Sequence, residues 1–165
     1  MSNEQHPEVA WLIEARKHIG LKEIKGDKHH PEIVQFWKDI KRGGIKTDEV
    51  PWCAAFVGAM LERVGVKSTR FESAKSYLDW GQLLALPVVG CIVIFTREGG
   101  GHVGFVVGRD TKGNLLVLGG NQGDEVNIRS FPVSRVTGYR WPIDRPIPKE
   151  PLPTLSAAQL SKTEA

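Results

Sequence analysis

The sequence predicts an α+β domain in which N-terminal helices pack on a C-terminal antiparallel β-sheet. Apolar residues recur at helical spacing in the first half of the chain. From Gly90 onward, short β-branched and apolar runs follow one another at about ten-residue intervals, separated by glycine-rich or Asp/Asn turns. Helices followed by strands in this order are typical of α+β proteins.

Three amphipathic helices and a shorter helical piece are expected. The first runs from about Pro7 to Ile19 and is stopped by Gly20. The second begins at Pro31, since proline suits a first turn, and the third, the most apolar, begins at Cys53. The apolar faces are Trp11, Leu12, Ala15 and Ile19; Ile33, Phe36, Trp37 and Ile40; and Cys53, Phe56, Val57, Met60, Leu61 and Val64; the short piece covers Ala74 to Trp80.

The strands are predicted from runs bounded by turn residues. Five such runs are expected in the sheet: Cys91 to Phe95, His102 to Val107, Leu115 to Leu118, Val126 to Ile128 and, closing the sheet, Val136 to Trp141.

Composition is that of one soluble globular domain. Of 165 residues, 41% are hydrophobic and 25% charged, and a domain of this length buries roughly two thirds of its unfolded surface without a disulfide or metal. Five of the ten prolines fall between residues 142 and 153, so we place the folded domain at residues 5–141 and a flexible, dispensable tail at 142–165.

Several classes of partner are not expected. A net charge of +3 is too mild a bias to indicate nucleic acid. No apolar run approaches the roughly 20 residues of a membrane span, and the first residues do not resemble a classical signal peptide. The sequence has no Asp-x-Asp-x-Asp loop and no HxxxH or HxH pair, so no metal or other cofactor is expected.

Cys53 is the strongest candidate for a catalytic residue. It falls at the expected start of the most apolar helix, where unpaired N–H groups and the helix dipole stabilise a thiolate and lower the thiol pKa. The alternative is that Cys53 is a small core residue, the commoner fate of an unpaired cysteine.

His102 is the histidine best placed to exchange a proton with a thiolate. It opens an apolar strand entered through three glycines, which let another segment approach closely. The alternative is a hairpin histidine with a satisfied hydrogen bond. The other four histidines, His6, His18, His29 and His30, are expected to be solvated.

Asn121 is the candidate for orienting the imidazole. It follows the next expected strand in Gly119-Gly120-Asn121-Gln122-Gly123, where its amide could bond the distal ring nitrogen. The alternative is simple turn chemistry. Gln122 and Asp124 are further candidates for the same role.

Taken together, three segments resemble the NlpC/P60 and CHAP group of papain-like cysteine peptidases and amidases, and more closely its small lysin-like members encoded by phages and prophages. The segments are Pro51-Trp52-Cys53-Ala54-Ala55-Phe56-Val57, Gly101-His102-Val103-Gly104-Phe105 and Gly119-Gly120-Asn121-Gln122, and the resemblance extends from about Trp11 to Trp141.

The resemblance implies a papain-like fold with Cys53 as nucleophile, His102 as base and Asn121 as the orienting residue. One position departs from it: members commonly carry Asp where this chain has Cys91, which we interpret as a buried, inert strand residue.

The implied function is peptidoglycan hydrolysis at an amide bond by a phage-type endolysin, as an endopeptidase or an N-acetylmuramoyl-L-alanine amidase. Trp52 could form a wall of the substrate groove, Gln122 could contact substrate, and Asp48 or Glu49 could meet a substrate ammonium or be solvated loop charges. Such a protein is expected to be a monomer, made in the bacterial host cytoplasm and acting on the wall after release, with help from a holin.

Two alternatives remain open at this point. One is a secreted antibacterial amidase toxin with an immunity protein. The other is a catalytically inactive wall-binding module.

Overall fold

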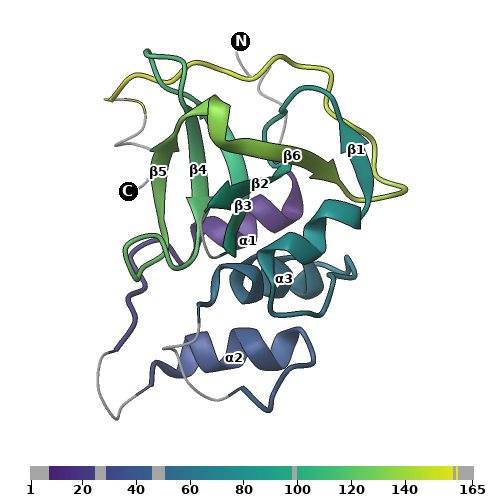
Figure 1. Cartoon of the computed structure of the whole chain (residues 1–165), viewed down its shortest axis with the longest axis vertical. Helices are drawn as coiled ribbons and strands as arrows, with labels where there is room; N and C mark the ends of the chain where they lie inside the picture. The colour runs from purple at the N-terminus through teal and green to yellow at the C-terminus, as the bar shows by residue number, and fades with distance from the viewer. Residues whose placement is uncertain (1–7, 25–28, 46–50, 98–99, 158, 160–165) are drawn as a thin grey trace.

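The computed structural model describes residues 8–24, 29–45, 51–97, 100–157 and 159. Within these residues, helices come first and an antiparallel sheet follows, which confirms the predicted α+β class (Figure 1). The helical elements are α1 (Ala10–Arg16), α2 (Pro31–Asp39), α3 (Cys53–Arg63) and the 3-10 helices η1 (Ala74–Asp79) and η2 (Val133–Arg135). The strands are β1 (Gln82–Leu84), β2 (Ile92–Arg97), β3 (Gly100–Arg109), β4 (Leu115–Gly119), β5 (Asn127–Phe131) and β6 (Val136–Trp141).

The strands pair in the order β1-β6-β2-β3-β4-β5, each antiparallel to its neighbour. The sequence pattern missed β1 because it has only three residues and its central Leu83 is 67% exposed. It also ended β5 too early, since the exposed Arg129 and Ser130 interrupt the apolar run but still pair with β4. Pairing with a neighbouring strand, not hydrophobicity, decides where such strands end.

Helix α3 forms the centre of the molecule. In Figure 1 it lies between α2 and the sheet, with α1 beside it. Every residue from Cys53 to Leu61 is buried, which explains why the sequence of α3 is apolar on all sides rather than along one stripe.

The connection between β4 and β5 is held against the first turn of α3. Its outer side pairs with the segment that follows α1: Val126 N–H donates to Leu21 O and Glu23 N–H to Asp124 O, each at 2.9 Å. Its inner side approaches α3 at Gly120, where a Cβ atom would lie 2.7 Å from both Phe56 Cβ and an indole carbon of Trp52. Only a residue without a side chain fits there.

We therefore expect Gly120→Ala to destabilise the protein by about 1–3 kcal/mol, the usual cost of overpacking, because the added methyl group displaces the connection from α3. The measurement is the free energy of unfolding in urea. Gly44→Ala is the matched control, since a Cβ atom at Gly44 meets nothing within 4 Å. Equal stability of the two variants would contradict the close approach at Gly120.

The segment after residue 141 contacts the sheet near both of its ends. Directly after β6, Pro142 O accepts from Gln82 Nε2 and Arg145 O accepts from the Trp141 indole N–H, each at 3.1 Å. Arg109 N–H donates to Pro153 O at 2.8 Å, and Leu155 N–H donates to Arg109 O at 2.7 Å, so this piece lies beside the end of β3 as a parallel bridge. Leu152 and Leu155 pack against the core. The boundary at residue 141 and the dispensability of the tail stay predictions. No helix in the part of the chain that the structure describes is long and apolar enough to cross a membrane.

Truncation after Asp144 is expected to lower the free energy of unfolding by about 1–3 kcal/mol and to leave the fold intact. It removes two main-chain hydrogen bonds, two half-buried leucines and Arg145 O, the acceptor of the Trp141 indole N–H. Truncation after Ala157 keeps these contacts and serves as the control. Far-ultraviolet circular dichroism and urea titration of both proteins test this, and an unfolded 1–144 protein would show that the tail is indispensable.

Candidate active site

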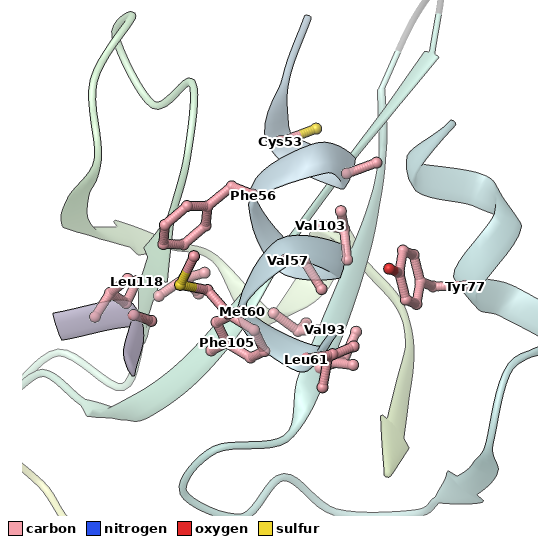
Figure 2. Close-up of a cluster of buried hydrophobic side chains, with 14 of the residues drawn as sticks. Cys53, Phe56, Val57, Met60, Leu61, Tyr77, Val93, Val103, Phe105 and Leu118 are labelled. Carbon is pink, nitrogen blue, oxygen red and sulfur yellow. The ribbon is translucent and has the colours of Figure 1, made fainter. Parts of the chain in front are cut away.

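Cys53 is the first residue of α3 and is 5% exposed. The N-cap residue, Trp52, makes no side-chain hydrogen bond to the first-turn N–H groups. Main-chain donors therefore gather around the position of the thiol, as expected for the start of a helix. Figure 2 shows Cys53 at the end of α3, above the buried cluster that contains Val57 and, from β3, Val103.

His102 lies near the start of β3, directly before Val103, and is 3% exposed. Its ring is stacked with Phe95 and Phe131 at centroid distances of 6.3 and 5.5 Å and interplanar angles of 20° and 23°. Phe95 pairs with His102 across β2 and β3. The two aromatic rings fix the plane of the imidazole and keep water from that part of the site.

Gln122 orients the imidazole of His102. His102 Nε2 and Gln122 Oε1 are 2.9 Å apart, and both side chains are buried. The other atom of this amide, Gln122 Nε2, donates to Val117 O, Asn127 O and Asn127 Oδ1, so the amide cannot be turned round. An oxygen acceptor at Nε2 assigns the ring proton to that nitrogen, which makes Nδ1 the basic nitrogen of the neutral ring.

Asn121, which the sequence analysis assigned to this role, lies one residue too early. Continuing the β3–β4 register from Phe105 and Leu118 would place Asn121 opposite His102. However, β4 ends at Gly119, and Asn121 enters the left-handed region with φ of 58°. The chain turns at Asn121, and as a result the side chain of the next residue, Gln122, contacts the imidazole of His102. Gln122 was predicted as a further candidate for this role, and also as a substrate contact, which stays a prediction.

The first turn of α3, which begins with Cys53, and the side chain of His102 both approach the Gly119–Gly120 pair. A Cβ atom at Gly119 would be 3.4 Å from His102 Nε2, while Gly120 touches Trp52 and Phe56, which flank Cys53 in the first turn of α3. Consecutive Cα atoms are about 3.8 Å apart. The fold thus brings the first turn of α3 and the His102–Gln122 pair to one place, although 49 residues separate Cys53 from His102 in the chain.

Trp52 does not form a groove wall in this structure. Its side chain is fully buried, and its indole N–H donates to Glu23 Oε1 at 2.9 Å. A groove wall needs exposed surface, so Trp52 instead fixes the entry to α3. The other two predicted substrate contacts, Asp48 and Glu49, lie outside the described residues.

Cys91 has the properties of an inert thiol. It is fully buried directly before β2, forms no disulfide with Cys53, and burial raises the pKa of its thiol to about 12. At neutral pH such a thiol stays protonated and does not act as a nucleophile. Among the described residues, no group of three or more His, Cys, Asp or Glu side chains could hold a metal ion.

Three residues of this site were missed by sequence reasoning. Asn127 begins β5 and accepts from the Gln122 amide, Glu23 accepts from Trp52, and Phe131 stacks on His102. Each comes from a segment distant in sequence or from a turn, where the residue type alone carries no signal of its contact.

Comparison with known proteins gives one family. Residues 45–121 match the CHAP domain, a span that includes Cys53, His102 and Asn121 and ends directly before Gln122. No curated protein matches the chain. The match to the CHAP domain over residues 45–121 is consistent with the NlpC/P60–CHAP superfamily of peptidases and amidases.

Proposed function

We propose that this protein hydrolyses an amide bond of bacterial peptidoglycan by a thiol mechanism in which Cys53 is the nucleophile and His102 the base. The CHAP domain indicates a family of peptidoglycan-hydrolase-like amidases and peptidases. The observation that carries the proposal is the hydrogen bond between His102 Nε2 and Gln122 Oε1, because it leaves Nδ1 as the proton-accepting nitrogen of the neutral ring.

In the first step, His102 Nδ1 takes the proton of the Cys53 thiol, and the thiolate attacks the carbonyl carbon of the substrate amide. The negative charge that develops on the carbonyl oxygen is stabilised by the Cys53 main-chain N–H. The N-cap residue Trp52 does not compete for this donor, since its indole N–H is itself a donor and is bonded to Glu23.

In the second step, the C–N bond breaks and His102 returns its proton to the leaving amine. The acyl group remains on Cys53 as a thioester. His102 then removes a proton from water, whose oxygen attacks the thioester carbon. The C–S bond breaks, the carboxylic acid product leaves, and His102 returns the proton to the Cys53 thiolate. Gln122 holds the other ring proton on Nε2 through both steps.

The proposed biological role is that of a phage-type endolysin. It would be made in the cytoplasm of the bacterial host, act on the wall after release with the help of a holin, and work as a monomer. Lytic activity as an endopeptidase or as an N-acetylmuramoyl-L-alanine amidase fits the same chemistry, and the bond that is cut distinguishes them.

The first test is digestion of purified peptidoglycan by the wild-type protein and by Cys53→Ala, with mass spectrometry of the released fragments. Fragments are expected only from the wild type, because alanine removes the nucleophile. Their new termini identify the bond that is cut. Cys91→Ala is the matched control and is expected to release the same fragments as the wild type, since Cys91 is buried and protonated.

Two outcomes would contradict the proposed chemistry. Equal digestion by Cys53→Ala would exclude a Cys53 thiol mechanism. Binding of the wild-type protein to several wall types without release of fragments would indicate a wall-binding module. A small inhibitor encoded next to this protein would favour a toxin with an immunity protein over an endolysin.

The second test distinguishes Gln122 from Asn121. Gln122→Ala is expected to lower kcat on the order of 100-fold, because the imidazole loses its orienting acceptor. Asn121→Gly removes the neighbouring amide while keeping the left-handed backbone that Asn121 adopts, and it is expected to retain most activity. Initial rates of peptidoglycan digestion measure both. The reverse ranking would return the orienting role to Asn121.

A further inference from the structure

The amide nitrogen of Gln122 lies among three oxygen atoms. Gln122 Nε2 is 3.1 Å from Val117 O, 2.9 Å from Asn127 O and 2.9 Å from Asn127 Oδ1. The Asn127 amide also binds in return, since its Nδ2 donates to Gln122 O at 2.9 Å. Residue 122 is thereby tied to β4 and β5 from both its side chain and its main chain.

None of the three oxygen atoms can donate a hydrogen bond, so only a group with N–H or O–H hydrogens is satisfied at this point. A carboxylate at position 122 would place a charged oxygen against three other oxygens in a site where residue 122 is 4% exposed. A buried charge that faces acceptors alone is strongly disfavoured. This cage of oxygen atoms therefore selects an uncharged amide.

The backbone leaves space for the Gln122 amide beside Gly119. Gly119 pairs with Asn127 across β4 and β5, and a Cβ atom at Gly119 would lie 2.4 Å from Gln122 Oε1. The absence of that Cβ lets Oε1 reach His102 while Nε2 stays in the cage. The two ends of one amide thus face two environments, acceptors on one side and the imidazole on the other.

We propose that Asn127 is a positioning residue of the active site. Together with the main-chain oxygens of Val117 and Asn127, its side chain keeps residue 122 an uncharged amide with Oε1 toward His102, and so holds the ring proton of His102 on Nε2. The catalytic consequence rests on the proposed function, whereas the tautomer itself is a property of the protein without substrate.

An uncharged orienting group has a defined chemical effect. It fixes the direction of the imidazole without adding a negative charge that would stabilise the imidazolium. Whenever the ring is neutral, this arrangement leaves the basic lone pair on Nδ1, the ring nitrogen that does not face Gln122.

The test is long-range ¹H–¹⁵N NMR of protein labelled with ¹⁵N-histidine, which reports the tautomer of His102 directly. In the wild-type protein the Nε2–H form is expected to dominate. Asn127→Ala is expected to give a mixture of both tautomers and a kcat about tenfold lower with KM unchanged. Tenfold is the lower end of the loss seen when a residue that hydrogen-bonds a functional side chain is removed from a metal site.

Two further variants separate positioning from general structural support. Asn127→Asp keeps an acceptor for the Gln122 amide and loses only the return bond, so it is expected to retain the Nε2–H tautomer even where stability falls. Gln122→Glu is expected to lose that tautomer at neutral pH. A carboxylate at position 122 would face the oxygen atoms of Val117 and Asn127, and the side chain would therefore be displaced from His102. Asn114→Ala is the matched control, since its amide bonds Asp110 in the β3–β4 turn, remote from His102 in the pairing register.

The inference is overturned if Asn127→Ala shows the wild-type tautomer, or if Gln122→Glu retains both the wild-type spectrum and full activity. If Asn127→Ala does not fold, the Gln122→Glu spectrum decides. A normal tautomer without any digestion of peptidoglycan would instead count against the proposed function alone, so the two failures are distinguishable.

Discussion

The chemistry proposed for this site depends on one hydrogen bond, from His102 Nε2 to Gln122 Oε1. It exists only because the connection between β4 and β5 is held in place from three directions. The segment after α1 pairs with its outer side, Gly120 rests on the first turn of α3, and Asn127 binds residue 122 from β5. The helices and strands place His102 and α3, and the position of the β4–β5 connection determines whether Gln122 reaches Nε2 and leaves Nδ1 as the basic nitrogen.

Glycine makes these contacts possible at consecutive positions. Gly119 leaves room for the Gln122 amide beside His102, and Gly120 leaves room for Trp52 and Phe56. A side chain at Gly119 would displace the Gln122 amide, and a side chain at Gly120 would displace the connection from α3. The sequence shows these glycines only as a turn signal, whereas in the folded protein they set the approach of α3 to His102.

Much of the fold and part of the site could be predicted from the sequence. The helices carry strong apolar periodicity, and the position of Cys53 at the start of α3 follows from that pattern. The partner of His102 could not be settled in the same way, because it depends on where β4 stops pairing. Strand alternation favours Asn121, and a single left-handed residue gives the contact to Gln122 instead. Turn geometry of this kind is decided by contacts with distant segments such as residues 21–23, which local sequence does not reveal.

The two cysteines show why burial alone does not identify a reactive thiol. Both are almost completely buried, yet they occupy different environments. Cys91 lies directly before β2, and burial holds the pKa of its thiol near 12. Cys53 begins a helix whose first turn approaches Gly120, the neighbour of the Gly119 that lies beside His102. An aspartate buried as deeply as Cys91 would place either a charge or a polar carboxylic acid in the core. Both lower the stability of the fold unless they are paired, whereas a neutral thiol does not. The cysteine therefore suits the closed core at that point, and the thiol at the helix start, Cys53, is the one to which we assign the proposed chemistry.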